Sequence, residues 1–95
     1  MIGVIAKLTV KAGMEEEFET HANALVSQVN ANEPGCVLYE LFKSKAGGEY
    51  VFMEKYTDKE ALAAHGQTDY FLAAQPKLGP CLAGAPDIQT YESVG

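Results

Sequence analysis

Apolar side chains occupy every second position at the start of the chain. They are Ile2, Val4, Ala6, Leu8 and Val10. A strict period of two is typical of a strand that buries one face. The pattern therefore predicts a half-buried strand over residues 2–11, which ends before Gly13.

The next segment changes to the period of a helix. The acidic run Glu15–Glu17 suits a first helical turn, because the N-terminus of a helix attracts negative charge. Apolar residues then recur at spacings of four, three and four positions, which marks one helical face. They are Phe18, Ala22, Leu25 and Val29. We expect a helix over residues 14–31, ended by Asn32, Pro34 and Gly35.

Two further strands are predicted in the middle of the chain. Residues 36–44 and 49–57 are both rich in aromatic and β-branched side chains, which favour strands. Between them lies Ala46-Gly47-Gly48, a composition typical of a tight hairpin turn. We therefore expect these two strands to pair as a hairpin.

The second half of the chain predicts helices and a last strand. Thr57 and Glu60 have the spacing of a capping box, which starts a helix at about residue 58. Gly66 interrupts that helix just after His65. A further helical stretch follows, bent or divided by proline and glycine, and residues 86–93 form a short strand. The apolar positions of that stretch are Phe71, Ala74, Leu78 and Leu82, and its breakers are Pro76, Gly79 and Pro80.

The order β-α-β-β-α-β predicts one α+β domain over residues 1–95. With right-handed crossovers this order builds a ferredoxin-like fold, in which a four-stranded antiparallel sheet carries its helices on one face. We expect no internal repeat, linker or second domain.

The strands are apolar on both faces, although helices can cover only one. Alternation places Cys36, Leu38 and Phe42 on one face and Val37, Tyr39 and Leu41 on the other, and sets Tyr50 and Phe52 against Val51 and Met53. Large exposed apolar patches usually mark association surfaces, so we expect a homodimer that packs sheet on sheet. The alternative is that polar side chains keep the free face in water, namely Lys7, Thr9, Lys43 and Lys55.

Charge and cysteine content narrow the class of partner. The 95 residues include 13 acidic and 7 basic side chains, a net charge of -6, which disfavours nucleic acid and anionic membranes as partners. No apolar run approaches the length of about 20 residues that spans a bilayer, and the N-terminus does not resemble a signal peptide.

Cys36 and Cys81 lack the spacing of a zinc site or a disulfide framework. We expect reduced thiols and a cytoplasmic protein.

No established catalytic motif is present, so candidate chemistry rests on single side chains. His65 is the candidate base, since an imidazole accepts protons near neutral pH; alternatively it bonds the last carbonyls of its helix. His21, beside Phe18 and Leu25, is expected to be a partly buried packing residue. Neither histidine has grouped partners that would form a metal site.

Glu54 shares a strand face with aromatic residues, so it must be paired or have a raised pKa. The structural alternative is a salt bridge to Lys7, Lys11 or Lys43, and Glu40 is equally ambiguous. The aromatic residues suit the stacking of a planar ligand, or they pack the core and an interface. They include Tyr39, Phe52, Tyr56, Tyr70 and Phe71.

Five segments resemble the antibiotic biosynthesis monooxygenase family, in order and in register over nearly the whole chain. They are KAGMEEEF at 11–18, NEPGCVLYEL at 32–41, YVFMEKY at 50–56, DKEALAAH at 58–65 and QTDYF at 67–71. The resemblance implies a ferredoxin-like monomer that pairs into a dimeric α/β barrel.

The resemblance also implies an activity, namely oxygenation by O₂ of a small quinol, phenolic or polycyclic aromatic substrate, without metal, flavin or haem. His65 matches the family's helix histidine and becomes the candidate catalytic residue. The pocket residues would be Tyr39, Phe52, Glu54, Tyr56, Tyr70 and Phe71. Two other readings stay open: a non-catalytic barrel that binds a small aromatic ligand, and an isomerase or cyclase that uses the same base without O₂.

Two departures from the family pattern limit how far the family's activity and residue roles apply to this chain. Many relatives have histidine where this chain has Tyr70. The haem-degrading branch uses an asparagine on the first strand and a tryptophan at the end of the third, whereas this chain has Ala6 and Lys7 nearby and no tryptophan. The resemblance therefore disfavours haem degradation.

Overall fold

The computed structural model describes residues 1–95 and contains four strands, three α-helices and one short 3₁₀ helix. In chain order they are β1 (Ile2–Thr9), α1 (Glu15–Asn32), β2 (Cys36–Lys43), β3 (Glu49–Tyr56), α2 (Lys59–His65), α3 (Asp69–Leu78), η1 (Gly79–Cys81) and β4 (Asp87–Glu92). Each element predicted from the sequence is present, with bounds that differ by one or two residues at most of the ends.

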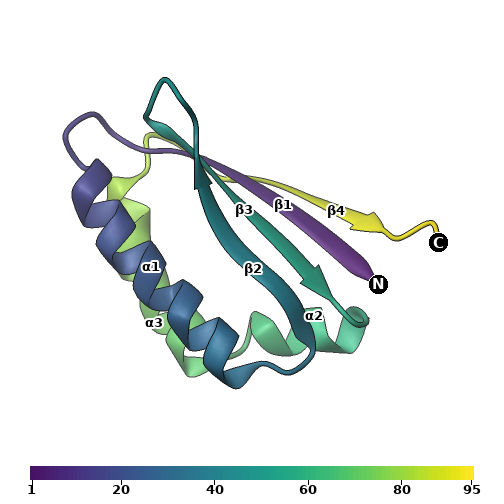
Figure 1. Ribbon diagram of the computed structural model, residues 1–95. Coiled ribbons are helices and arrows are strands. Elements are labelled where there is room, and N and C mark those ends of the chain that lie inside the picture. Colours follow the sequence, from purple (N-terminus) through teal and green to yellow (C-terminus); the bar gives the residue numbers. More distant parts are fainter.

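The four strands form one antiparallel sheet in the order β2-β3-β1-β4. All three α-helices lie on the same side of it, and the other side is free of helices (Figure 1). The expected α+β ferredoxin-like fold is therefore confirmed. The β2–β3 turn relies on Gly47 and Gly48, whose φ angles of 81° and 80° are ones that other residues rarely adopt.

The core lies between the sheet and the helices, as the two periodicities predict. The five alternating apolar residues of the first segment, from Ile2 to Val10, are all buried. The apolar stripe of α1 is buried as well and includes Phe18, Ala22, Leu25 and Val29. No helix is both long enough and apolar enough to cross a membrane.

The faces of β2 differ from simple alternation because the strand contains a bulge. Cys36 pairs with Tyr56 while Leu38 pairs with Lys55, so the register shifts between them. One extra residue turns the start of a strand to the opposite face. Cys36 therefore packs on the helix side against Tyr56, and does not share a face with Leu38 and Phe42 as predicted.

The ends of α2 and α3 depend on two capping side chains. Asp58, not Thr57, caps α2, since its carboxylate accepts a hydrogen bond of 2.8 Å from the backbone N–H of Ala61. Thr68 caps α3 by accepting from the N–H of Phe71, and its hydroxyl also donates to the carbonyl of His65. Thr68 therefore joins the end of α2 to the start of α3. Pro76 lies inside α3 without dividing it.

The free face of the sheet exposes apolar side chains. Leu38, Phe42 and Met53 keep 39%, 41% and 40% of their surface exposed. By register, Ile5 lies opposite Met53 on the same face. Charged groups are interspersed, since Lys55 and Lys7 lie on β3 and β1. This surface, defined by Ile5, Leu38, Phe42, Met53 and Tyr91, is called the open face below.

Candidate functional site

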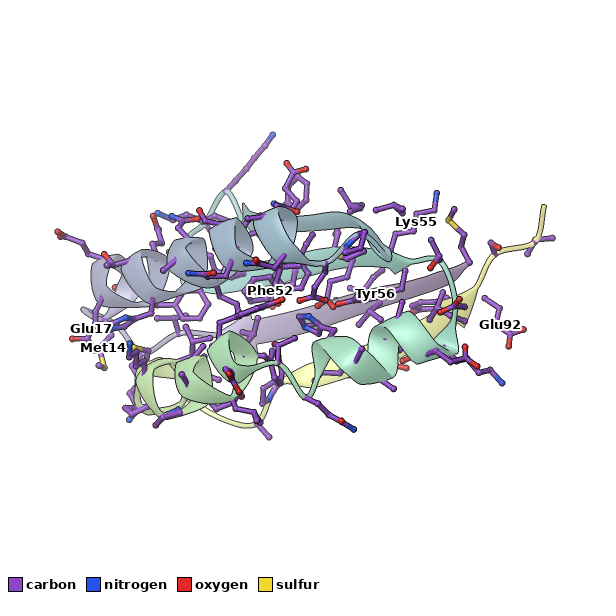
Figure 2. The ribbon with its side chains drawn as sticks, turned by 90° about the horizontal axis from the view of Figure 1, so that it is seen from below. Met14, Glu17, Phe52, Lys55, Tyr56 and Glu92 are labelled. Atoms are coloured by element: carbon purple, nitrogen blue, oxygen red, sulfur yellow. The ribbon has the colours of Figure 1, made fainter.

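A cavity of about 350 Å³ lies between the sheet and the α2–α3 side of the helix layer. Its wall is mostly apolar and takes residues from all four strands and from α1, α2, α3 and η1. Figure 2 shows Phe52 and Tyr56 reaching from β3 into the space between α1 and the α2–α3 pair. Most of the residues predicted to form a pocket gather here: Tyr39, Phe52, Glu54, His65 and Phe71 all line the cavity.

His65 is a buried polar residue at the C-terminus of α2, with 4% of its surface exposed. Its ring packs among three aromatic rings, with centroid distances of 5.1 Å to Tyr39, 5.5 Å to Tyr56 and 4.7 Å to Phe71. Its Nδ1 lies 3.1 Å from both carboxylate oxygens of Glu33. The alternative that His65 bonds the last carbonyls of its helix is therefore wrong.

Glu33 reaches His65 because the chain leaves α1 at this residue. Proline disfavours helical backbone in the residue before it, and Pro34 follows Glu33 directly. Glu33 accordingly has extended dihedral angles, φ -115° and ψ 90°, just beyond the end of the helix. Its carboxylate is nearly as buried as the imidazole, with side-chain exposures of 11% and 5%.

The second ring nitrogen of His65, Nε2, has no hydrogen-bond partner in the protein, whereas Nδ1 bonds Glu33. Every fully buried side-chain nitrogen and oxygen in the structure is hydrogen-bonded, so Nε2 retains accessible surface. The cavity is the one pocket that His65 lines. Nε2 is therefore the ring nitrogen that no protein group occupies, on a residue that lines the cavity.

Glu54 supplies a carboxyl group to the same cavity. The hydroxyl of Tyr56 donates a hydrogen bond of 2.6 Å to its Oε1, and no lysine lies within salt-bridge distance. The expected salt bridge to Lys7, Lys11 or Lys43 is therefore absent, and Lys43 pairs with Glu19 instead. Burial raises the pKa of Glu54, although the Tyr56 hydrogen bond and the nearby imidazole oppose the shift.

Two tyrosine hydroxyls in this region stay protonated at neutral pH. Burial raises the pKa of Tyr56 far above its ordinary value, and the hydrogen bond to Glu54 adds to the shift. Burial likewise raises the pKa of Tyr39, with the charge of Glu54 as the next cause. Tyr56 packs behind His65 and does not itself line the cavity.

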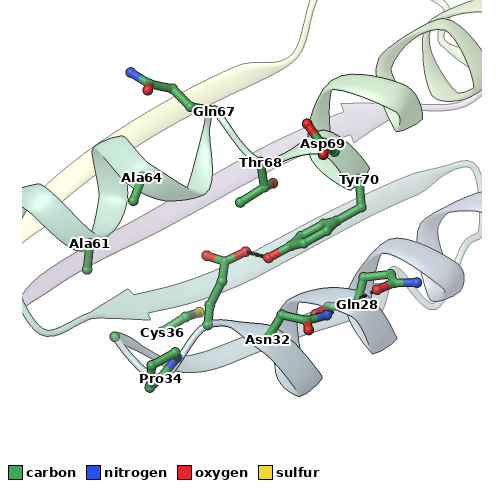
Figure 3. Close-up of a pocket in the computed structure, with 12 residues that line it drawn as sticks. Gln28, Asn32, Pro34, Cys36, Ala61, Ala64, Gln67, Thr68, Asp69 and Tyr70 are labelled. Carbon is green, nitrogen blue, oxygen red and sulfur yellow. Dashed lines mark hydrogen bonds between the residues drawn. The ribbon is translucent and has the colours of Figure 1, made fainter.

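Tyr70 lies outside the cavity, contrary to its place among the predicted pocket residues. It lines an open groove of about 740 Å³ between the end of α1 and the α2–α3 connection, together with Glu33. Its hydroxyl donates a hydrogen bond to Oε2 of Glu33 (Figure 3). Burial and this hydrogen bond raise the pKa of Tyr70 to about 12, so it remains a neutral donor.

Other polar candidates lie apart from the cavity. His21 is half-buried on α1 and faces α3, as expected for a packing residue. Cys36 and Cys81 are free thiols, and burial raises the pKa of both. No group of three His, Cys, Asp or Glu side chains is arranged to hold a metal ion.

Glu33 is the residue of this site that the sequence pattern does not reveal. It lies 32 positions before His65 in the chain, and no local periodicity links the two. The available signal was its position directly before Pro34, which removes it from the helix but does not identify its partner.

The sequence model of a known protein family, described as antibiotic biosynthesis monooxygenase, matches residues 1–77. The chain belongs to this family. One member is YcnE of Bacillus subtilis, provisionally named a monooxygenase, which is 38% identical over 94 residues that cover 97% of each chain. The family assignment deduced from the five sequence segments is confirmed.

Further relatives of this member of the antibiotic biosynthesis monooxygenase family are known by structure and by sequence. A crystal structure of a provisionally assigned member from Caulobacter crescentus has a TM-score of 0.96 and 45% identity, covering 99% of this chain and 90% of that one. The uncharacterised Synechocystis protein sll1783 is 28% identical over 92 residues, and this chain spans 62% of its length. The family and the names of the Bacillus and Caulobacter relatives support monooxygenase chemistry, and none of the names states a substrate.

Proposed function

We propose that this protein is a homodimeric monooxygenase that oxidises a small quinol or phenolic compound with O₂ and without a bound cofactor. The observation that carries the proposal is that His65, whose Nε2 has no protein partner, lines an apolar cavity. Membership of the antibiotic biosynthesis monooxygenase family agrees with this chemistry. The cytoplasmic location expected from the sequence stays a prediction.

In the proposed first step Nε2 of His65 removes the proton of a substrate hydroxyl. The O–H bond breaks, its electron pair stays on the substrate oxygen, and an N–H bond forms. General bases of this kind accelerate proton transfer by about 10²–10⁴-fold. The buried carboxylate of Glu33, 3.1 Å from Nδ1, stabilises the imidazolium because opposite charges attract strongly in a low-dielectric interior.

The resulting anion is electron-rich enough to reduce O₂ itself. One electron passes to O₂, and the radical pair combines to form a carbon–oxygen bond and a peroxide. The imidazolium protonates the peroxide. The ring carbon then loses its proton, the C–H electron pair forms a C=O bond, the O–O bond breaks, and the departing hydroxide takes up a proton to become water. Quinol and O₂ thus give hydroxyquinone and water, and all four electrons that reduce O₂ come from the substrate.

The cavity favours substrates of one or two rings. Its volume of about 350 Å³ is near the lower end of small-molecule pockets, which span roughly 300–1,000 Å³. Aromatic walls from Tyr39, Phe52 and Phe71 suit a planar ring, because offset and edge-to-face contacts are favourable. Compounds with three or four fused rings are disfavoured in this chain.

The homodimer is supported by the open face. Ordinary monomers expose few contiguous apolar side chains, and larger patches mark association surfaces. Leu38, Phe42 and Met53 are each about two-fifths exposed on one side of the sheet, opposite the helices. A second copy packed sheet on sheet would bury this surface by a twofold interface.

The test is O₂ consumption with a panel of one-ring and two-ring quinols, comparing wild type with His65→Gln. We expect turnover in the wild type and a loss of about 10²-fold or more in the variant. His21→Gln is the matched control, since His21 lies outside the cavity, and it should keep full activity. Unchanged turnover in His65→Gln would remove His65 from the mechanism.

The panel also separates the alternative functions. Quinol binding without O₂ uptake, and with no change in the ligand, would indicate the non-catalytic binding barrel. Conversion of the ligand without O₂ uptake would indicate an isomerase or cyclase.

A further inference from the structure

Two side chains on the far side of His65 form a hydrogen-bonded chain with it. Nδ1 of His65 bonds Glu33, and Oε2 of Glu33 accepts a second hydrogen bond from the Tyr70 hydroxyl. The three residues come from three separate elements: the end of α2, the segment after α1, and the first turn of α3. Figure 3 shows Tyr70 directed from α3 toward the C-terminal end of α1.

We infer that Glu33, held by Tyr70, is a positioning residue that fixes His65 in its Nδ1–H tautomer and so leaves Nε2 as the base. This inference rests on the proposed function for its catalytic consequence, but the tautomer itself is a property of the free protein.

The assignment follows from hydrogen-bond chemistry. An ionised carboxylate only accepts hydrogen bonds, and Glu33 already accepts one from the Tyr70 hydroxyl. Nδ1 must therefore carry the proton in its contact with Glu33. In a neutral imidazole the other nitrogen is then an acceptor, and this nitrogen is the unpartnered Nε2.

Tyr70 contributes by fixing the carboxylate. Glu33 follows the last turn of α1 and lines the open groove, with 11% of its side chain exposed. The neutral Tyr70 hydroxyl occupies Oε2 and restricts the carboxylate to the orientation in which both oxygens face Nδ1. In this chain of three groups, His65 is the base, Glu33 orients it, and Tyr70 orients Glu33, as in catalytic triads where a third group orients the base.

Glutamine at position 33 should reverse the tautomer. Its amide has the shape of the carboxylate but carries an N–H group, which can donate a hydrogen bond to the lone pair of an unprotonated Nδ1. The proton then moves to Nε2, and the base is lost although the imidazole remains in place. The Tyr70→Phe variant keeps the accepting carboxylate but frees its orientation, so part of the population should lose the contact with Nδ1 and the tautomers should mix.

The chain contains a matched control for both changes. The hydroxyl of Tyr50 donates to the carboxylate of Glu19 in the same way, with the glutamate again on α1. Neither residue lines the cavity or contacts His65. Glu19→Gln and Tyr50→Phe therefore make the same chemical changes without reaching the proposed site.

The experiment is ¹⁵N NMR of the imidazole nitrogens in substrate-free protein, where tautomers have distinct chemical shifts. The chain has two histidines, so His21→Gln assigns the signals. We expect the Nδ1–H tautomer in wild type, in Glu19→Gln and in Tyr50→Phe, the Nε2–H tautomer in Glu33→Gln and a mixture in Tyr70→Phe. An Nε2–H signal in the wild type, or an unchanged signal in Glu33→Gln, overturns the inference.

Steady-state kinetics with a quinol that the wild type oxidises give the second measurement. Glu33→Gln should lower kcat by on the order of 10² or more and change KM less than about threefold, because Glu33 does not line the cavity. A loss that appears only in KM contradicts a positioning role. If no quinol is turned over, the proposed function fails while the NMR result still decides the tautomer; if Glu33→Gln does not fold, Tyr70→Phe carries the test.

Discussion

Gly35 passes so close to α2 that a Cβ built on it would lie 2.7 Å from the Cβ of Ala61. Such a contact is too short for two carbon atoms, and neither methyl group can rotate away. The φ angle of Gly35 is not positive, so backbone conformation does not require glycine here. Glycine is needed because the start of β2 and the helix that carries His65 share this space.

Replacing Gly35 with alanine should therefore push α2 away from β2. We expect a loss of stability of about 1–3 kcal/mol, the usual cost of overpacking, together with reduced quinol turnover as His65 moves. Chemical denaturation and O₂ uptake measure the two effects. Gly84→Ala is the control, since nothing lies within 4 Å of a Cβ at Gly84.

A second substitution tests the steric cause of that loss. Ala61→Gly removes the opposing methyl group, so the Gly35→Ala/Ala61→Gly double variant should recover more stability than the sum of the single effects allows. The coupling between contacting residues is typically about 0.5–3 kcal/mol. Additive effects would contradict the contact.

The sequence contains the fold because each element has a local signal of its own. The alternation from Ile2 to Val10 and the stripe of α1 identify their buried faces without reference to any other part of the chain. In the same local way, the glycines at 47 and 48 identify the β2–β3 turn. Fold, element order and the covered face of the sheet therefore follow from short-range patterns.

The candidate site can be predicted from the sequence only in part, because its most important contacts join residues far apart in the chain. The pattern predicts His65, Glu54 and the aromatic walls, which share faces of regular elements. The bond between Glu33 and His65 depends on how the end of α1 meets the end of α2, which no local spacing encodes. The bulge between Cys36 and Leu38 is likewise invisible to a rule of strict alternation.

The cavity predicts that an enlarged side chain at Ala6 is tolerated. Ala6 lines the cavity, so leucine there should fill empty space and change stability by less than about 1 kcal/mol. The same filling should weaken quinol binding at least about tenfold, or about 1.4 kcal/mol. Calorimetry of unfolding and ligand titration are the measurements.

Ala22 provides the comparison for that change. It is fully buried on α1 and lines none of the pockets. Ala22→Leu should cost about 1–3 kcal/mol by overpacking. Equal costs at Ala6 and Ala22 would contradict the presence of a cavity.

Glu54 predicts a stability that falls as pH rises. Burial raises its pKa in the folded state, so the folded protein binds this proton more tightly than the unfolded chain. Stability then declines between the ordinary glutamate pKa, about 4.3, and the higher folded value. Glu54→Gln should remove this decline and be more stable relative to wild type at pH 7 than at pH 3.

Glu19 predicts the opposite slope in the same experiment. Hydrogen bonds from Tyr50 and Lys43 lower its pKa, so its contribution is present above the ordinary pKa and is lost as pH falls through the folded value. Glu19→Gln should therefore be less stable relative to wild type at pH 7 than at pH 3. Denaturation curves at both pH values measure the stability of each variant relative to wild type. If that difference changed with pH in the same direction for Glu54→Gln and Glu19→Gln, the assignments would be wrong.

The open face predicts which substitution separates the two copies of the proposed dimer. Met53 lies opposite Ile5 on β1 and Glu40 on β2, and is 40% exposed. Lysine at this position meets Glu40 within its own sheet, which protects the monomer fold, but places a charge in an apolar interface. We expect Met53→Lys to raise the dimer dissociation constant at least about 100-fold, or about 2.7 kcal/mol, as measured by sedimentation equilibrium.

Leu72→Lys is the matched control, because Leu72 is 55% exposed on the helix side, and this variant should remain dimeric. If Leu72→Lys dissociates the dimer and Met53→Lys does not, the copies associate through their helices and the open face faces water.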